Sequence, residues 1–111
     1  RTSMFPFLKI NKTKITKIGK SKKISKKSKK YKTQINYKKI PNAYKYEIQY
    51  GNDKKFKATK TKRTKNTKYT ISKLKNKKTY YIRVRAYGYQ FGERVYGKWS
   101  ITKKLKIKRK K

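Results

Sequence analysis

The chain has 111 residues, a length that suits one domain, and its 39 lysine and arginine residues face only 3 acidic ones. Only 32% of the residues are hydrophobic, but 14% are aromatic, and large rings can supply the core that the few aliphatic side chains cannot. The absence of cysteine excludes disulfides and thiolate metal sites, and no apolar run is long enough to span a membrane. We therefore expect one small folded domain with basic ends.

Residues 1–30 are predicted to form a basic N-terminal segment, with one strand within 11–18 and a lysine-rich loop over 19–30. A short apolar head opens the segment, and water-exposed apolar surface costs about 25 cal/mol per Å². We expect the head to pack on a sheet edge or face, either its own or that of a neighbouring subunit. A frayed terminus or linker is the alternative. The residues of the head are Met4, Phe5, Phe7 and Leu8.

From residue 31 onward, apolar and polar side chains alternate in short segments that turn residues separate. A period of two without a sustained helical period is typical of strands with one buried face. The predicted core covers 31–108, and a basic tail covers 109–111. After the strand within 11–18, the expected strands lie at 31–37, 44–50, 56–58, 69–74, 80–87 and 101–107. Seven short strands in this length predict an all-β sandwich of two sheets.

The alternation also predicts which side chains face the core. Glu47 and Arg85 fall on outward positions, and we expect Glu47 to be a surface charge. The inward positions of the third and sixth strands are Tyr44, Tyr46, Ile48, Tyr50, Tyr80, Ile82, Val84 and Ala86. The outward positions of the sixth strand are Tyr81, Arg83, Arg85 and Tyr87.

In "LKNKKTYYIRVRAYG", Leu74 is followed six residues later by Tyr80 and then by apolar residues at alternate positions. This pattern resembles the fibronectin type III domain, in the form common in secreted bacterial proteins, where such a tyrosine caps the turn before the sixth strand. "INYKKIPNAYKYEIQYGNDKKF" is similar to the second and third strands of that family, with Tyr37 where tryptophan is usual. "VYGKWS" is similar to the start of the last strand.

The resemblance implies an immunoglobulin-like sandwich of seven strands, with the Tyr80 hydroxyl bonded to the backbone near Leu74 to Lys77. It also implies a spacer, adhesion or ligand-binding module that is extracellular or at the cell surface and uses no cofactor.

The titratable residues argue against an enzyme. Acid–base catalysis near neutral pH usually needs histidine or paired carboxylates. The chain has no histidine, and its acids, Glu47, Asp53 and Glu93, fall on three separate segments. We therefore predict no catalytic residue, no metal site and no cofactor.

A formal net charge of +36 favours polyanionic partners. Most of this charge is lysine, which acts as a point charge and lacks the planar fork with which arginine reads bases. We therefore predict binding of nucleic acid through its phosphates without sequence readout. The predicted contacts are Arg83, Arg85, Lys103, Lys104, Lys106, Lys108 and Arg109.

Five outward aromatic residues are candidates for stacking on bases, and cross-strand packing against lysine stems is the alternative. They are Tyr81, Tyr87, Tyr89, Phe91 and Tyr96, with Tyr81, Tyr87 and Phe91 as the preferred ones. The high charge is also compatible with two different roles. One is a plain solvated surface. The other is a structural subunit or spacer of a secreted or cell-surface assembly, such as a filament or adhesin, whose lysines adhere to acidic walls or polysaccharide. This structural role is compatible with nucleic-acid binding, because a filament subunit could wrap DNA or RNA.

Overall fold

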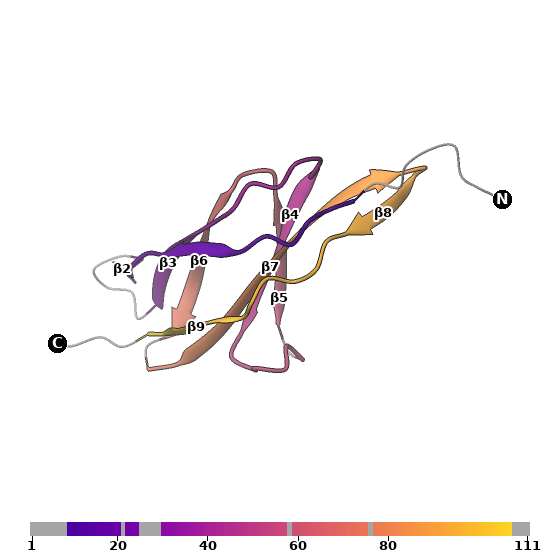
Figure 1. Cartoon of the computed structure of the whole chain (residues 1–111). Helices are drawn as coiled ribbons and strands as arrows, with labels where there is room; N and C mark the ends of the chain where they lie inside the picture. The colour runs from indigo at the N-terminus through magenta and orange to yellow at the C-terminus, as the bar shows by residue number, and fades with distance from the viewer. Residues whose placement is uncertain (1–8, 21, 25–29, 58, 76, 108–111) are drawn as a thin grey trace.

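The computed structural model describes residues 9–20, 22–24, 30–57, 59–75 and 77–107, whose strands form two antiparallel sheets (Figure 1). No helix occurs among these described residues. The expected all-β sandwich of two sheets is therefore confirmed. The strands are β1 (Ile15–Ile18), β2 (Lys22–Lys23), β3 (Lys30–Tyr37), β4 (Lys45–Gly51), β5 (Lys60–Thr64), β6 (Lys68–Lys75), β7 (Thr79–Gln90), β8 (Glu93–Tyr96) and β9 (Lys103–Lys106).

The smaller sheet, here the β3 sheet, has β3 at its centre. β6 pairs along one edge of β3, while β1 and β2 pair in succession with the other edge. Alternate residues of β3 are buried, as the sequence predicts, and the buried hydroxyl of Thr33 donates a hydrogen bond of 2.6 Å to the carbonyl of Gly19. This sheet carries one face of the core.

The larger sheet, here the β7 sheet, places β4 beside β7 and β5 beyond β4 as an open edge. On the other side of β7, β8 pairs with its C-terminal end and β9 with its N-terminal end. Between β8 and β9, the amides of Gly97 and Ser100 donate to the carbonyls of Ala86 and Val84 at 2.8 and 2.7 Å. β8 and β9 are therefore two parts of one last strand, and with the short β2 set aside the described residues form seven strands, the expected number.

Some expected boundaries are wrong. Phe56, expected in a strand, instead lies in a turn with a φ of 58°, Ala58 is outside the described residues, and the following strand is β5. β5 contains only lysine, arginine and threonine, so alternation could not reveal it. Ile101, expected in the last strand, precedes β9 and is 67% exposed. β2 lies inside the expected basic loop.

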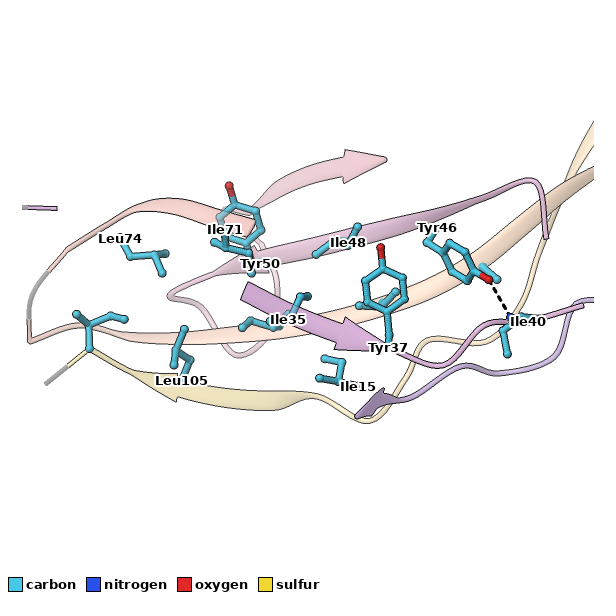
Figure 2. Close-up of a cluster of buried hydrophobic side chains, with 14 of the residues drawn as sticks. Ile15, Ile35, Tyr37, Ile40, Tyr46, Ile48, Tyr50, Ile71, Leu74 and Leu105 are labelled. Carbon is cyan, nitrogen blue, oxygen red and sulfur yellow. Dashed lines mark hydrogen bonds between the residues drawn. The ribbon is translucent and has the colours of Figure 1, made fainter. Parts of the chain in front are cut away.

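The core between the sheets is built from isoleucine and tyrosine (Figure 2). Tyr37 occupies a core position and packs against Tyr46, with ring centroids 5.1 Å apart. The Tyr37 hydroxyl donates to the carbonyl of Asn66 at 2.6 Å, and the Tyr46 hydroxyl accepts from the amide of Ile40 at 2.8 Å. Burial raises the pKa of Tyr37 well above its usual range. The tyrosines thus fill the core while their hydroxyls reach backbone partners at its margin.

The tyrosine corner is present. The hydroxyl of half-buried Tyr80 accepts a hydrogen bond of 2.8 Å from the amide of Lys75, inside the expected range. This bond ties the end of β6 to the start of β7 and supports the resemblance on which the fold prediction rested.

We expect Tyr80→Phe to lower the free energy of unfolding by about 1 kcal/mol, the usual net value of one hydrogen bond. Denaturant unfolding of both proteins measures the change, and Tyr81→Phe is the matched control on the neighbouring residue. Equal losses in the two variants would contradict a special role for Tyr80.

The described chain starts beside β8 and ends at the turn between β6 and β7, at opposite ends of the sandwich (Figure 1). At the first end the backbone of Ile10 and Asn11 passes so close to Gly97 that a Cβ there would lie 2.9 and 2.8 Å from their carbonyl oxygens. At the second end, the amide of Ile107 donates to the carbonyl of Lys78 at 2.9 Å. The chain therefore runs through the domain from one end to the other.

Candidate functional site

The outer face of the β7 sheet, which points away from the core, holds a buried acid. Glu47 on β4 lies directly opposite Arg63 on β5 and Arg85 on β7. Its two carboxylate oxygens accept bonds from Arg63 at 2.9 Å and from Arg85 at 2.8 Å, and the residue is only 3% exposed. The expectation of a solvated surface charge at Glu47 is therefore wrong, because arginines on both neighbouring strands close over it.

Beside this ion pair, two arginines and three aromatic rings alternate in one stack, here the arginine ladder. The guanidinium of Arg83 lies 4.1 Å from the ring centroid of Phe56 and 4.2 Å from that of Trp99. That of Arg85 lies 4.2 Å from Trp99 and 3.6 Å from Tyr96. Burial and the neighbouring Arg85 lower the pKa of Arg83 from its usual value. The ladder covers the middle of the outer face.

The sequence did not indicate the ladder as a unit. Alternation placed Arg83 and Arg85 outward, but the rings that enclose them come from the turn before β5 and from the last strand. The one hint in the sequence was that two aromatic residues, Tyr96 and Trp99, lie close together in the segment "VYGKWS".

At the end of the β7–β8 hairpin, four tyrosines and one arginine form the hairpin-end cluster: Tyr44, Tyr87, Tyr89, Arg94 and Tyr96. The β7–β8 register sets it, because Tyr87 pairs with Tyr96 and Tyr89 with Arg94. The amide of Tyr44 donates to the carbonyl of Tyr87 at 2.7 Å and brings Tyr44 alongside. Arg94 donates to the hydroxyls of Tyr89 at 3.3 Å and Tyr96 at 2.9 Å.

The exposure of these rings differs from the sequence prediction. Tyr87, expected outward and available for stacking, is 2% exposed because the other rings of the cluster surround it. Burial raises its pKa. Tyr44, expected in the core, is instead 49% exposed, since it precedes β4 and packs on the outer side against Tyr87 and Tyr89. Of the other stacking candidates, Tyr81 is half-buried, while Tyr89, Phe91 and Tyr96 are exposed.

The predicted polyanion contacts fall into separate groups. Lys103, Lys104 and Lys106 are exposed on β9, and Lys104 lies directly opposite Tyr81, on the outer face. Arg83 and Arg85 lie on the same face but stack within the ladder, and Arg85 also pairs with Glu47. Lys108 and Arg109 lie outside the described residues, as do the predicted assembly residues Met4, Phe5, Phe7 and Leu8.

The three acidic residues compensate only a small part of the positive charge. Glu47 is enclosed by arginines, and the carboxylate of Asp53 accepts from the amides of Lys55 at 2.9 Å and Lys57 at 3.2 Å. The bond from Lys55 is the main cause that lowers the pKa of Asp53. Glu93 is exposed at the start of β8. Every lysine whose exposure the structure describes is exposed except half-buried Lys45. The lysines thus face solvent, while the salt bridges of Glu47 are made with Arg63 and Arg85.

Within the described ranges, no three histidine, cysteine, aspartate or glutamate residues come together to hold a metal ion. No helix long and apolar enough to cross a membrane is found in this part of the chain. A surface pocket between β6 and the β4–β5 turn is lined by residues such as Tyr50, Tyr80, Lys60 and Lys73, with no acid among its lining residues.

Neither a family model nor a curated protein matches this sequence. Among solved structures, the chain is similar to the crystal structure of domains A168–A170 from titin, with a TM-score of 0.58 and 15% sequence identity. The match covers 90% of this chain and 32% of that chain. At this identity the likeness shows the fold alone, and that fold is a sandwich of the fibronectin type III or immunoglobulin-like kind.

Proposed function

We propose that this chain is a non-enzymatic module that binds polyanions, above all nucleic acid, through backbone phosphates and without sequence readout. One observation carries the proposal. The described lysines are exposed, except half-buried Lys45, while Glu47 pairs with arginines and Asp53 accepts hydrogen bonds from backbone amides of the same chain. A surface of this kind concentrates polyanions and releases their counterions on binding. The extracellular or cell-surface location implied by the resemblance remains part of this proposal.

The arginines support the absence of sequence readout. Reading a guanine in the major groove needs a free guanidinium fork. Arg63, Arg85 and Arg94 bond to Glu47 or to tyrosine hydroxyls, and Arg83 donates to the side chain of Gln49 at 2.8 Å. The exposed cations are therefore mostly lysines, which suit phosphates.

We expect the full chain to bind DNA duplexes of equal length and shuffled sequence with the same Kd, because phosphate contacts carry no sequence information. Fluorescence anisotropy at a fixed salt concentration measures this. A clear preference for one sequence would contradict phosphate binding without readout. No detectable binding at about 100 mM salt would remove the nucleic-acid function, since specific and non-specific DNA-binding proteins both retain affinity there.

A second candidate function is that of a structural spacer in a secreted or cell-surface assembly. The path of the chain favours it, because the described residues enter at one end of the sandwich and leave at the other (Figure 1). Domains joined through such ends would line up in series. Small-angle scattering of two copies joined in tandem tests this, and a folded-back pair would contradict it.

A further inference from the structure

The hairpin-end cluster combines exposed aromatic rings with cations. Tyr44, Tyr89 and Tyr96 are 49%, 46% and 39% exposed, although each packs against another tyrosine. Contacts between these rings join their apolar area into one exposed patch, and such patches often mark binding sites. The β7–β8 hairpin that carries two of them extends beside the start of β4 at one end of the sandwich (Figure 1).

The rings are held in place by their own packing. The planes of Tyr44 and Tyr89 meet at 72°, and those of Tyr87 and Tyr89 at 84°. Perpendicular rings do not stack face to face, and the exposed parts of Tyr44 and Tyr89 are left to solvent and to the cations beside them. Buried Tyr87 contacts Tyr44, Tyr89 and Tyr96 and fixes their positions. The rings are therefore pre-organised to receive a planar group.

The charged groups that contact the exposed rings are cations. The ammonium groups of Lys45 and Lys65 lie 5.4 and 5.6 Å from the ring centroid of Tyr44. Arg94 lies between the other rings, donates to the hydroxyls of Tyr96 and Tyr89, and is a permanent cation. Glu93 is on the opposite face of β8, since it shares its side with Val95, which packs on the core.

We infer that the hairpin-end cluster is a stacking site for unpaired bases of single-stranded nucleic acid, with Tyr44 and Tyr89 as the stacking rings and Lys45, Lys65 and Arg94 on adjoining phosphates. Exposed tyrosines beside cations are the combination that binds single strands without sequence preference. A neutral sugar would use the rings but not the three cations. The inference rests on the proposed polyanion-binding function and adds a preference for unpaired bases.

The test compares three probes of equal phosphate number: an oligonucleotide of about 12 thymidines, the corresponding abasic strand, and a duplex. The full chain is expected to bind the thymidine strand more tightly than the abasic strand. Tyr44→Ala and Tyr89→Ala should each weaken thymidine binding by about tenfold, the effect of losing one stacked base. Abasic and duplex binding should stay unchanged, because neither offers an accessible base.

Matched variants separate stacking from other causes. Tyr44→Phe keeps the ring, and its thymidine affinity should stay well above that of Tyr44→Ala, whereas Lys65→Gln should weaken all three probes. The tyrosine variants should also leave the salt dependence of thymidine binding unchanged, since they remove no charge. Denaturant unfolding checks that the alanine variants remain folded.

Equal weakening of thymidine and abasic binding in the alanine variants would overturn base stacking while leaving polyanion binding intact. A loss of heparin affinity that matched the loss for thymidine would also overturn it and would indicate a sugar-stacking site. If the unaltered chain bound none of the nucleic-acid probes, the proposed function itself would fail, and the stacking site with it.

Discussion

Between about 50 and 200 mM salt, the affinity of this protein for duplex DNA is expected to fall by about 10³- to 10⁵-fold, the effect of six to ten phosphate contacts. The physical reason is counterion release, which makes the logarithm of the affinity a linear function of the logarithm of the salt concentration. Titrations of one duplex at several salt concentrations measure the slope.

The structure indicates which residues should set this slope. Lys104 and Lys106 are exposed on β9, and the residues opposite them on β7 are not acidic. Each lysine that contacts a phosphate should contribute about one unit to the slope, so Lys104→Gln or Lys106→Gln should lower the slope by about that amount. Arg85 is already compensated by Glu47 and enclosed by Trp99 and Tyr96, so Arg85→Gln should change the slope less. A flat salt dependence in the unaltered chain would contradict phosphate binding.

We expect Glu47→Gln to lower the free energy of unfolding by about 3 kcal/mol, because the substitution breaks a buried ion pair. Removal of this carboxylate leaves Arg63 and Arg85 as neighbouring cations without a counter-charge on a surface that is already strongly basic. Both arginines retain some contact with water, which keeps the expected loss at the low end for a broken buried pair.

Denaturant unfolding measures this loss, and Glu93→Gln is the matched control. Glu93 is exposed, so its substitution should change the free energy of unfolding by less than about 0.5 kcal/mol. Equal effects at the two positions would show that net charge alone matters. In that case the buried ion pair would contribute nothing specific.

The sequence predicted the inward side of the sandwich well, because the core imposes a strict period of two. Ile48, Ile82 and Val84 are fully buried where alternation placed them, and Tyr80 makes the expected corner bond. Alternation could not show which outward positions are covered by side chains from elsewhere. Glu47 and Tyr87 are buried on the outer face for this reason, since arginines and tyrosines from neighbouring strands close over them.

The candidate site was predictable only in part. The exposed lysines of β9 followed from composition and alternation. Tyr89 and Tyr96 were stacking candidates from their outward positions, but their grouping with Tyr44 and Arg94 was not predictable. It depends on the register of β7 with β8 and on the backbone bond that holds Tyr44 beside Tyr87. Both are long-range properties of the fold that a single strand does not encode.

The lysine-rich edge strand β5 has a consequence for solubility. Open edges of sheets are templates for aggregation, and natural proteins often protect them with charged side chains. The lysines of β5 are exposed, and their mutual repulsion opposes edge-to-edge association of two copies in free solution. A polyanion that neutralised these lysines would remove the repulsion while concentrating copies along one polymer. The same charge that keeps single molecules apart would then allow coated strands to condense.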